Sequence, residues 1–563
     1  MGNNAMLYSQ FIVNKKAVPH PLPAQKEGAD RLKLFQDKFS IYKKAGEPLY
    51  KTPKSVQECI EILKIAPDGI FEVAGNRYSK SYLFSDVNYN TTSEAEQVGI
   101  FESYCKFLNA MDVEFKITIN NKNRNMKALR EKVLFQKKND GNDAERDCYN
   151  QIMEKKIMEG KQGIEQERYL TVSIIRKNYE EAKAAFASLE AVLQKGFGEL
   201  GSSLVTLNGV ERLRTLHDFY RMGEEEYFAF DFEEAVRVSR DYKDDICNSM
   251  LKFYPTYMQD EKRFAKALFI KKYPSSLSDR FLTELATVPA HTVISIDVAP
   301  IPKDVTTSTL QKKYMGIESD IIRQQRVRNK NNDFSSDISY NKRTEKQQIE
   351  EIMDDVREND QRLFYVAVTI IIKADTKEEL EATEETLVTI GKRNSCQIEA
   401  HYLKQREALN TALPIGVRQV ETMRTLMTQS LAVLMPFNVQ ELYLPGKGGT
   451  YYGVNQVSRN ILFGNRKRLV NGNGFIFGVP GSGKSFFAKM EMGNVFLNTD
   501  DDIIVIDPQH EYFGIAERFG GQVVVLSTYT GNHINPMALP EDVSDVAAHL
   551  FWLQINLIDC HRI

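Results

Sequence analysis

Two kinds of hydrophobic pattern alternate along this chain. Apolar and polar residues alternate strictly in Val113-Glu-Phe-Lys-Ile-Thr-Ile119, which is typical of a half-buried strand. In other stretches, such as 94–108, apolar residues recur every three or four positions and predict an amphipathic helix. The first part of the chain is thus predicted to form strands near 69–73, 81–85, 113–119, 169–175 and 203–207, and helices near 92–108, 179–193 and 210–220.

A similar order of elements returns in the second part of the chain. The patterns predict strands near 266–270, 292–298, 364–372 and 397–402, and helices near 278–286, 377–390 and 405–412. Because the order repeats, we predict an α+β amino-terminal region of two related ferredoxin-like units, each a small sheet with helices on one face. Coincidence between two ordinary α+β layers is the alternative.

A long charged insert interrupts the second unit at 308–359. Arginines and lysines crowd its middle, whereas its second arm, 350–360, is acidic. This distribution favours a helical hairpin with a solvated face over a nucleic-acid patch, because few aromatic residues interleave the basic ones. Docking of a partner protein is also compatible with it.

The patterns divide the chain into five regions. They predict an exposed lead-in or tether at 1–65, the first α+β unit at 66–222, the second α+β unit at 223–416, a connector at 417–470 and a P-loop domain at 471–563. Within the connector, 417–436 is predicted to form a helix, and 451–455 and 460–463 short strands.

Length, charge and cysteine usage exclude some classes of protein. A chain of 563 residues needs several domains, because a single core seldom grows past roughly 250 to 300 residues. The formal net charge is only −3 with acids and bases interspersed, which argues against a global basic field for nucleic acid or anionic lipid. The six cysteines are scattered singly, and no apolar run is long enough to span a bilayer. We therefore expect a cytosolic chain without a metal-binding cysteine cluster, whose contact with a membrane would be peripheral.

The clearest chemical signal is the stretch 474–485, where a predicted apolar strand at 475–477 runs into a G-x-x-x-x-G-K-S loop. Its glycines let successive backbone N–H groups turn toward a phosphate chain. Lys484 would reach the β- and γ-phosphates of ATP as the catalytic cation, and the Ser485 hydroxyl would ligate Mg²⁺. A helix that begins near Ser485 would add its positive end to the same anion. The predicted nucleotide-binding residues are Gly478, Val479, Pro480, Gly481, Ser482, Gly483, Lys484, Ser485 and Phe486.

A second candidate for the site follows this helix. The apolar run 503–506 predicts a buried strand that ends in Asp507, with Glu511 shortly after it. If this strand neighbours the phosphate-loop strand, as in kinase-like and GTPase-like folds, Asp507 would hold Mg²⁺ through water. If the fold is RecA-like, the magnesium-side Asp and the water-activating Glu lie on a later strand, and Asp507 belongs to a more distant one. The spacing alone leaves both interpretations open.

Several motifs occur together in a fixed order. G-V-P-G-S-G-K-S-F-F-A-K precedes D-D-I-I-V-I-D-P-Q-H-E-Y, Gly520-Gly521 and Ile534-Asn-Pro-Met-Ala-Leu539, and it follows Leu413-Pro-Ile-Gly416 and Tyr451-Tyr-Gly453. In this order the chain resembles the VirB/TrbE-type ATPases that energise type IV secretion and conjugation. The resemblance implies an α+β region followed by a RecA/FtsK/HerA-like motor, and it supports the second interpretation of Asp507.

The resemblance also implies cofactors and partners. The cofactors are ATP and Mg²⁺. The partners are further copies of the chain in a homo-oligomer, other secretion-channel subunits and a peripheral contact at the cytoplasmic face of the inner membrane. Nucleic acid is a further candidate partner.

One departure from the family pattern changes these expectations. The family's later strand with its Asp-Glu pair has no counterpart before Ile563, so we expect a motor domain truncated after the predicted helix 543–557. The apolar segments 475–477, 503–506 and 523–526 would then lack sheet partners. We expect such a chain to bind nucleotide weakly and to be deficient in hydrolysis on its own, so its status as an enzyme stays open. The alternatives are a non-catalytic scaffold that binds secretion-channel partners and a fragment of a HerA-like DNA translocase.

Overall fold

The computed structural model describes residues 55–531, except 124–125, 160–163, 248–249, 275, 331–339, 441, 445, 456–459, 470, 527–528 and 530. The chain divides into two compact units. The sheet unit comprises the described parts of 1–131, 154–443 and 453–462, and the loop unit those of 132–153, 444–452 and 463–563. The predicted helix at 543–557 and the motif at 534–539 lie outside the described residues.

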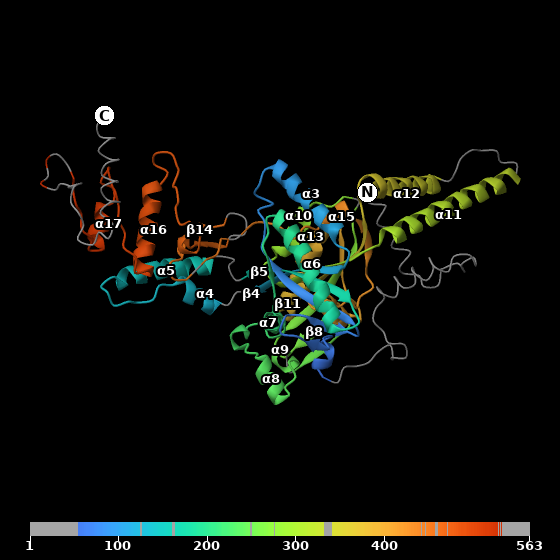
Figure 1. The fold of residues 1–563 in the computed structure, drawn as a ribbon, viewed down its shortest axis with the longest axis horizontal. Helices are drawn as coiled ribbons and strands as arrows, with labels where there is room; N and C mark the ends of the chain where they lie inside the picture. Colours follow the sequence, from blue (N-terminus) through green and yellow to red (C-terminus); the bar gives the residue numbers. More distant parts are fainter. Residues whose placement is uncertain are drawn as a thin grey trace. The chain divides into compact units, whose positions relative to one another are not determined.

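One antiparallel sheet of 13 strands organises the sheet unit (Figure 1). Its strands follow the order β1-β2-β3-β5-β4-β10-β11-β9-β8-β7, with β6 paired to β3, β12 to β9 and β13 to β11. The strands are β1 (Lys64–Ile65), β2 (Phe71–Ala74), β3 (Arg77–Phe84), β4 (Glu114–Asn123), β5 (Ile164–Ile175), β6 (Leu204–Thr206), β7 (Leu251–Phe253), β8 (Met258–Asp260), β9 (Phe264–Lys272), β10 (His291–Pro300), β11 (Leu363–Ala374), β12 (Gln397–Ala400) and β13 (Arg424–Met427).

The two halves of this sheet have the same strand order. The first half runs β6-β3-β5-β4 and the second β12-β9-β11-β10, and the halves meet where β4 and β10 pair antiparallel. Ile117 faces Ile296 and Ile119 faces Ile294 across this joint. The prediction of two separate small sheets is therefore wrong, because the free edges of β4 and β10 satisfy each other's backbone groups.

Helices cover both faces of the sheet. The larger core contains buried residues of α3, α6, α10 and α13, whereas α7 and α14 pack into a second core with Phe71, Val293 and Ile371. Val293 and Ile294 belong to different cores because successive strand side chains point to opposite faces. The prediction of helices on one face holds for four helices and is wrong for α7 and α14. The helices of the unit are α3 (Glu94–Ala110), α6 (Tyr179–Glu199), α7 (Gly209–Tyr220), α8 (Phe232–Val238), α9 (Lys243–Ile246), α10 (Arg280–Ala286), α13 (Lys377–Arg393), α14 (Gln405–Ala412) and α15 (Thr428–Ala432).

Each half carries a helical insert at the same topological position. Helices α4 (Met126–Val133) and α5 (Asp143–Glu159) lie between β4 and β5, and α11 (Lys303–Lys330) and α12 (Tyr340–Glu358) lie between β10 and β11. The predicted hairpin in the second half is confirmed, and Figure 1 shows α11 and α12 extending away from the sheet. We refer to residues 126–159 as the upstream insert.

Two predictions at the edges of the sheet unit are wrong. The end of the predicted exposed lead-in joins the fold, because Ile60 and Ile62 are buried and β1 pairs with β2. The predicted helix at 417–436 is replaced by strand β13 and the short helix α15. Strand β13 takes the edge of β11, which satisfies backbone groups that a helix in its place would leave unpaired. No helix in the described part of the chain is long and apolar enough to cross a membrane.

Candidate functional site

The candidate site is the phosphate loop that opens helix α16 (Lys484–Asn498) in the loop unit. Gly481 and Gly483 adopt φ values of 78° and 88°, in a region that other residues rarely enter. A Cβ on Gly478 would lie 2.4 Å from the Ser482 hydroxyl, so a larger residue there would have to turn this hydroxyl away. The backbone conformation of the loop therefore favours glycine at 481 and 483, as the sequence predicts.

The lysine of the motif, Lys484, is hydrogen-bonded to the backbone of its own loop. Its Nζ donates to the carbonyl oxygens of Gly478 at 2.9 Å and Val479 at 3.1 Å. These are neutral acceptors on an exposed loop. A phosphate oxygen would replace them with an anionic acceptor and add the attraction between opposite charges to the hydrogen bond.

The first turn of α16 fits an anion. Its N-cap is Gly483, which has no side chain to accept from the first N–H groups of the helix. Those donors and the positive end of the helix dipole are therefore free for a phosphate group. Ser485 lies in this turn, half-buried, where a hydroxyl ligand for Mg²⁺ is expected, and Phe486 is exposed beside it.

A polar cluster connects the residues that precede the phosphate loop to helix α16. Arg466 donates to Glu491 on α16 with Nε at 2.6 Å and Nη2 at 3.1 Å, and the Tyr452 hydroxyl donates to the same carboxylate at 2.7 Å. Nη1 of Arg466 also donates to the Gly472 carbonyl at 3.2 Å. A Cβ on Gly474 would lie 2.0 Å from this guanidinium, so a larger residue there would have to displace the Arg466 side chain. Tyr452 belongs to β14 (Thr450–Val454), which pairs with β15 (Ile461–Gly464); the prediction of short strands at 451–455 and 460–463 is confirmed.

Three further strands predicted around the phosphate loop do not form. The segments 475–477, 503–506 and 523–526 belong to no strand and are exposed or only half-buried. Phe475 and Phe477 are 84% and 88% exposed, and Ile504 and Ile506 are 92% and 91% exposed. The prediction of a buried strand at 503–506 is therefore wrong, and among the described residues none of these three segments pairs with a strand.

The second pair of candidate residues is Asp507 and Glu511. Among the described residues, no hydrogen bond joins either of them to the phosphate loop. Oδ2 of Asp507 accepts from the backbone N–H of Tyr512 at 2.9 Å, and this bond is the main cause that lowers the pKa of Asp507. Glu511 is exposed in the same turn, which precedes α17 (Phe513–Arg518). Both interpretations of Asp507 assumed a strand that the structure does not form. Among the described residues, no cluster of three or more His, Cys, Asp or Glu side chains could hold a metal ion.

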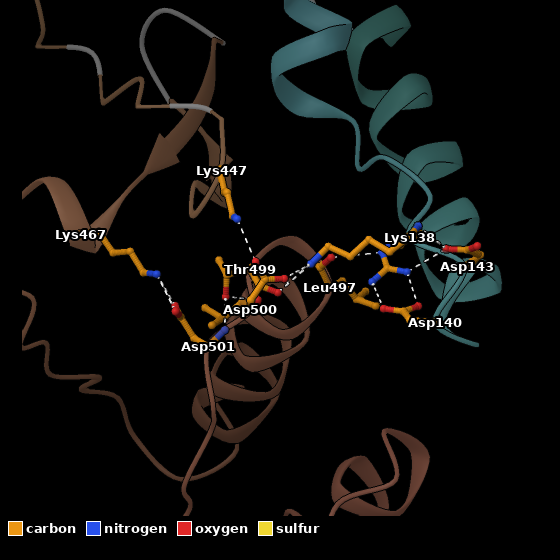
Figure 2. A network of polar contacts seen from close by, with 11 residues as sticks. Lys138, Asp140, Asp143, Lys447, Lys467, Leu497, Thr499, Asp500 and Asp501 are labelled. Atoms are coloured by element: carbon orange, nitrogen blue, oxygen red, sulfur yellow. Dashed lines mark hydrogen bonds and ion pairs between the residues drawn. The ribbon is translucent and has the colours of Figure 1, made fainter.

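The far end of α16 is held by residues that the sequence did not single out (Figure 2). Arg146 of the upstream insert is fully buried and donates from Nε to the Leu497 carbonyl at 3.1 Å. Lys138 donates to the Thr499 carbonyl and to Asp500, both at 2.8 Å, and Lys447 donates to Asp500 at 2.9 Å. No local pattern indicates the contacts of Lys138 and Arg146, since more than 300 residues separate them from their partners on α16 and its C-cap.

Comparison with known proteins agrees with this site. Residues 466–550 match the family model described as "Helicase HerA, central domain". The matched segment begins at Arg466 and includes the phosphate loop, α16 and Asp507. No curated protein matches the chain. This region is thus similar to P-loop ATPases and translocases of the HerA class, which implies nucleotide and Mg²⁺ as ligands.

Proposed function

We propose that this chain is an ATP- and Mg²⁺-binding subunit of the P-loop ATPase class. The observation that carries the proposal is the geometry of the loop. Two left-handed glycines lead into a helix whose N-terminus has no side-chain cap, within the segment similar to HerA. Such an arrangement binds phosphate groups through backbone donors and the helix dipole.

Each residue of the motif has a role in this proposal. The backbone of 478–483 would cradle the phosphates, with Val479 and Pro480 shaping the loop and Phe486 at its edge. Lys484 would leave its two carbonyl acceptors for the β- and γ-phosphates and balance charge on a transferring phosphoryl group. Ser485 would supply the hydroxyl ligand of Mg²⁺.

We further propose that the subunit serves type IV secretion or conjugative transfer. The support is the order of motifs that resembles VirB/TrbE-type ATPases. The sheet unit would be the partner-binding part, made of two ferredoxin-like halves with the succession β-α-β-β-α-β in each. On this proposal the chain acts as a homo-oligomer beside other channel subunits at the cytoplasmic face of the membrane.

Two other functions are supported by particular observations. A non-catalytic scaffold is favoured by the contrast between a continuous sheet of 13 strands and a phosphate loop whose neighbouring apolar segments are exposed. A DNA translocase is favoured by the HerA match itself. Salt-dependent binding of duplex DNA would support the translocase, because phosphate contacts release counterions.

Titration of the 563-residue chain with a fluorescent ATP analogue and Mg²⁺ tests the proposal. We expect saturable binding that Lys484→Ala weakens by about tenfold or more, because one charge-assisted contact to phosphate is lost. Lys489→Ala is the matched control, since Lys489 lies on the same helix and contacts the Tyr512 ring. Equal effects of the two substitutions, or no binding by the parent chain, would contradict a nucleotide-binding role. The non-catalytic scaffold would then be the better-supported function.

A further inference from the structure

The turn between β12 and α14 places two large side chains in the solvent. Tyr402 is 68% exposed and Leu403 is 55% exposed. Both ends of this turn are anchored, because the His401 N–H donates to the Ala267 carbonyl at 2.9 Å and Nε2 of Gln405 donates to the His401 carbonyl at 2.6 Å. Gln405 is 2% exposed, and its Oε1 accepts from the Ala267 N–H at 2.8 Å. The two exposed side chains are therefore held in place by a buried framework.

Leu403 has a backbone conformation that is unusual for its residue type. Its φ is 58°, in the left-handed region. The other non-glycine residues with positive φ in the described part of the chain are asparagine, aspartate, serine or histidine. A branched apolar residue is strained in this region, and an exposed one gains little from burial in return. Because strained residues are concentrated at functional sites, Leu403 is a candidate contact residue.

A second turn, between β7 and β8, lies beside Leu403. The Leu403 N–H donates to the Pro255 carbonyl of this turn at 2.7 Å. In the same turn the rings of Tyr254 and Tyr257 stack, with their centroids 4.4 Å apart. The two turns thus form one surface, which we call the tyrosine patch: Tyr254, Tyr257, Tyr402 and Leu403.

Cations border the tyrosine patch. Lys252 precedes the first turn and Lys404 follows the second, and both are exposed. Nζ of Lys377 lies 5.3 Å from the centre of the Tyr257 ring. Tyrosine is enriched in the hot spots of protein interfaces, and a patch that is fixed before binding loses little conformational entropy. The tyrosine patch therefore suits a partner surface that is both apolar and acidic.

The sheet unit itself carries a surface of this kind, the segment 224–241, which we call the acidic segment. It contains seven acidic and two basic residues and therefore has a formal net charge of −5. Both basic residues already pair with acids, Arg237 with Glu234 at 3.7 Å and Arg240 with Asp245. The negative charge of the segment is thus only partly compensated by its own cations.

The acidic segment also exposes apolar side chains. Tyr227 is 79% exposed, and Val236 and Val238 of α8 are 78% and 62% exposed. Phe228 and Phe230 pack against the second core and attach the segment to the sheet unit. Figure 1 shows α8 at the periphery of this unit. Exposed apolar side chains within an acidic segment complement the tyrosine patch, which is apolar and bordered by cations.

We propose that the tyrosine patch of one copy of this chain binds the acidic segment of a second copy. This inference rests on the homo-oligomer of the proposed function, but it requires no bound nucleotide. The occupant is a second copy because the chain carries both complementary surfaces, within the same compact unit. Since every copy has one surface of each kind, the contact can repeat from copy to copy.

Sedimentation velocity of the full chain over a concentration series tests this contact. We expect self-association that weakens as salt is raised, because exposed charges are screened. Leu403→Gly is expected to weaken self-association by about tenfold, the loss typical of a truncated hot-spot residue. It should leave the thermal unfolding midpoint unchanged or raise it, because glycine adopts a positive φ without strain. A merely structural role of Leu403 would instead lower this midpoint.

Val236→Lys is the variant on the opposite surface. It should weaken self-association by about tenfold or more, because it places a cation against the lysines that border the tyrosine patch. A mixture of Leu403→Gly and Val236→Lys chains is expected to form a heterodimer, since the first variant keeps its acidic segment and the second its tyrosine patch. Val205→Ser in β6 is the matched control, because Val205 is 54% exposed and belongs to neither surface.

The outcomes separate this contact from the other proposals. A parent chain that stays monomeric at every concentration overturns the contact and the proposed homo-oligomer. Self-association that Leu403→Gly leaves unchanged, or a mixture of the two variants that forms no heterodimer, overturns the contact alone. Affinity for the fluorescent ATP analogue is measured on the same samples and is expected to be equal in all of them. Failure of the parent chain to bind this analogue overturns the nucleotide proposal and leaves the contact standing.

Discussion

At the scale of single residues, buried side chains rather than regular structure hold the segment 413–417 against the sheet. The carbonyl groups of Pro414, Ile415 and Gly416 accept from Arg212 at 3.0 Å, Ser79 at 2.7 Å and Ser173 at 3.0 Å. Nζ of Lys116 donates to the Val417 carbonyl at 2.9 Å, and burial lowers the pKa of this lysine to about 8. The motif Leu-Pro-Ile-Gly thus has a structural explanation, independent of any resemblance.

Gly416 is the residue in this segment with the least freedom to change. Its φ is 81°, and a Cβ would lie 2.5 Å from Cβ of Ser79 and 2.5 Å from Oγ of Ser173. We expect Gly416→Ala to lower the free energy of unfolding by about 2–4 kcal/mol, because a strained backbone and an overpacked contact add together. Urea unfolding followed by circular dichroism measures this loss.

Gly99→Ala is the matched control for Gly416→Ala. Gly99 lies inside α3 with open space around its Cα. Alanine there is expected to raise stability by about 0.5–1 kcal/mol, because glycine is the poorer helix former. If both substitutions had the same effect, the tight fit of Gly416 would not exist in solution.

At the scale of elements, local patterning predicted most of the sheet unit. Strands such as β4 and helices such as α6 follow from alternation and helical spacing, which each segment carries in its own sequence. The helix predicted at 417–436 does not form, because part of this segment pairs as β13 with the free edge of β11, which is far away in sequence. The phosphate loop was predictable residue by residue, whereas Arg146 was not, because its partner Leu497 is visible only in the fold.

The α11–α12 hairpin contains two small hydrophobic cores, one within the hairpin and one where the hairpin meets the sheet. Ile349 packs with Ile317 and Ile321 inside the hairpin, whereas Ile352 packs with Ile301 and Leu363 at its base. Both isoleucines are 1% exposed, so the two positions differ in their neighbours and not in burial. The outer part of the hairpin should therefore open without opening the sheet.

Alanine at these two positions tests this independence. Ile352→Ala is expected to lower the free energy of unfolding of the sheet unit by about 2–4 kcal/mol, since Leu363 belongs to β11. Ile349→Ala is expected to speed amide exchange in the outer turns of α11 and α12 and to leave the global unfolding midpoint unchanged. A shared drop in that midpoint would show that the hairpin unfolds only together with the sheet.

At the scale of the whole molecule, the pairing of β4 with β10 is the feature that patterning could not predict. The sequences of β4 and β10 have the pattern of any strand in their own half. Which strand pairs with which depends on residues far apart in the sequence. The need for a partner strand also explains why three predicted strands of the loop unit are missing. Its segments 475–477, 503–506 and 523–526 have the sequence of buried strands, but a strand forms only where a neighbour satisfies its backbone groups.

The exposed segments of the loop unit lead to a prediction that contrasts the two units. Ile504 is 92% exposed, so Ile504→Ser should change the free energy of unfolding by less than about 0.5 kcal/mol. Ile370 in β11 is fully buried, and Ile370→Ser should cost about 3 kcal/mol or more, because a core cavity and an unsatisfied hydroxyl are created together. The combination Phe477→Ser with Ile504→Ser should also reduce binding of the dye ANS, which reports exposed apolar surface. Denaturant unfolding and ANS fluorescence on the same samples measure both effects. If Ile504→Ser were as costly as Ile370→Ser, the 503–506 segment would be paired in solution, and the loop unit would contain the sheet that its sequence predicts.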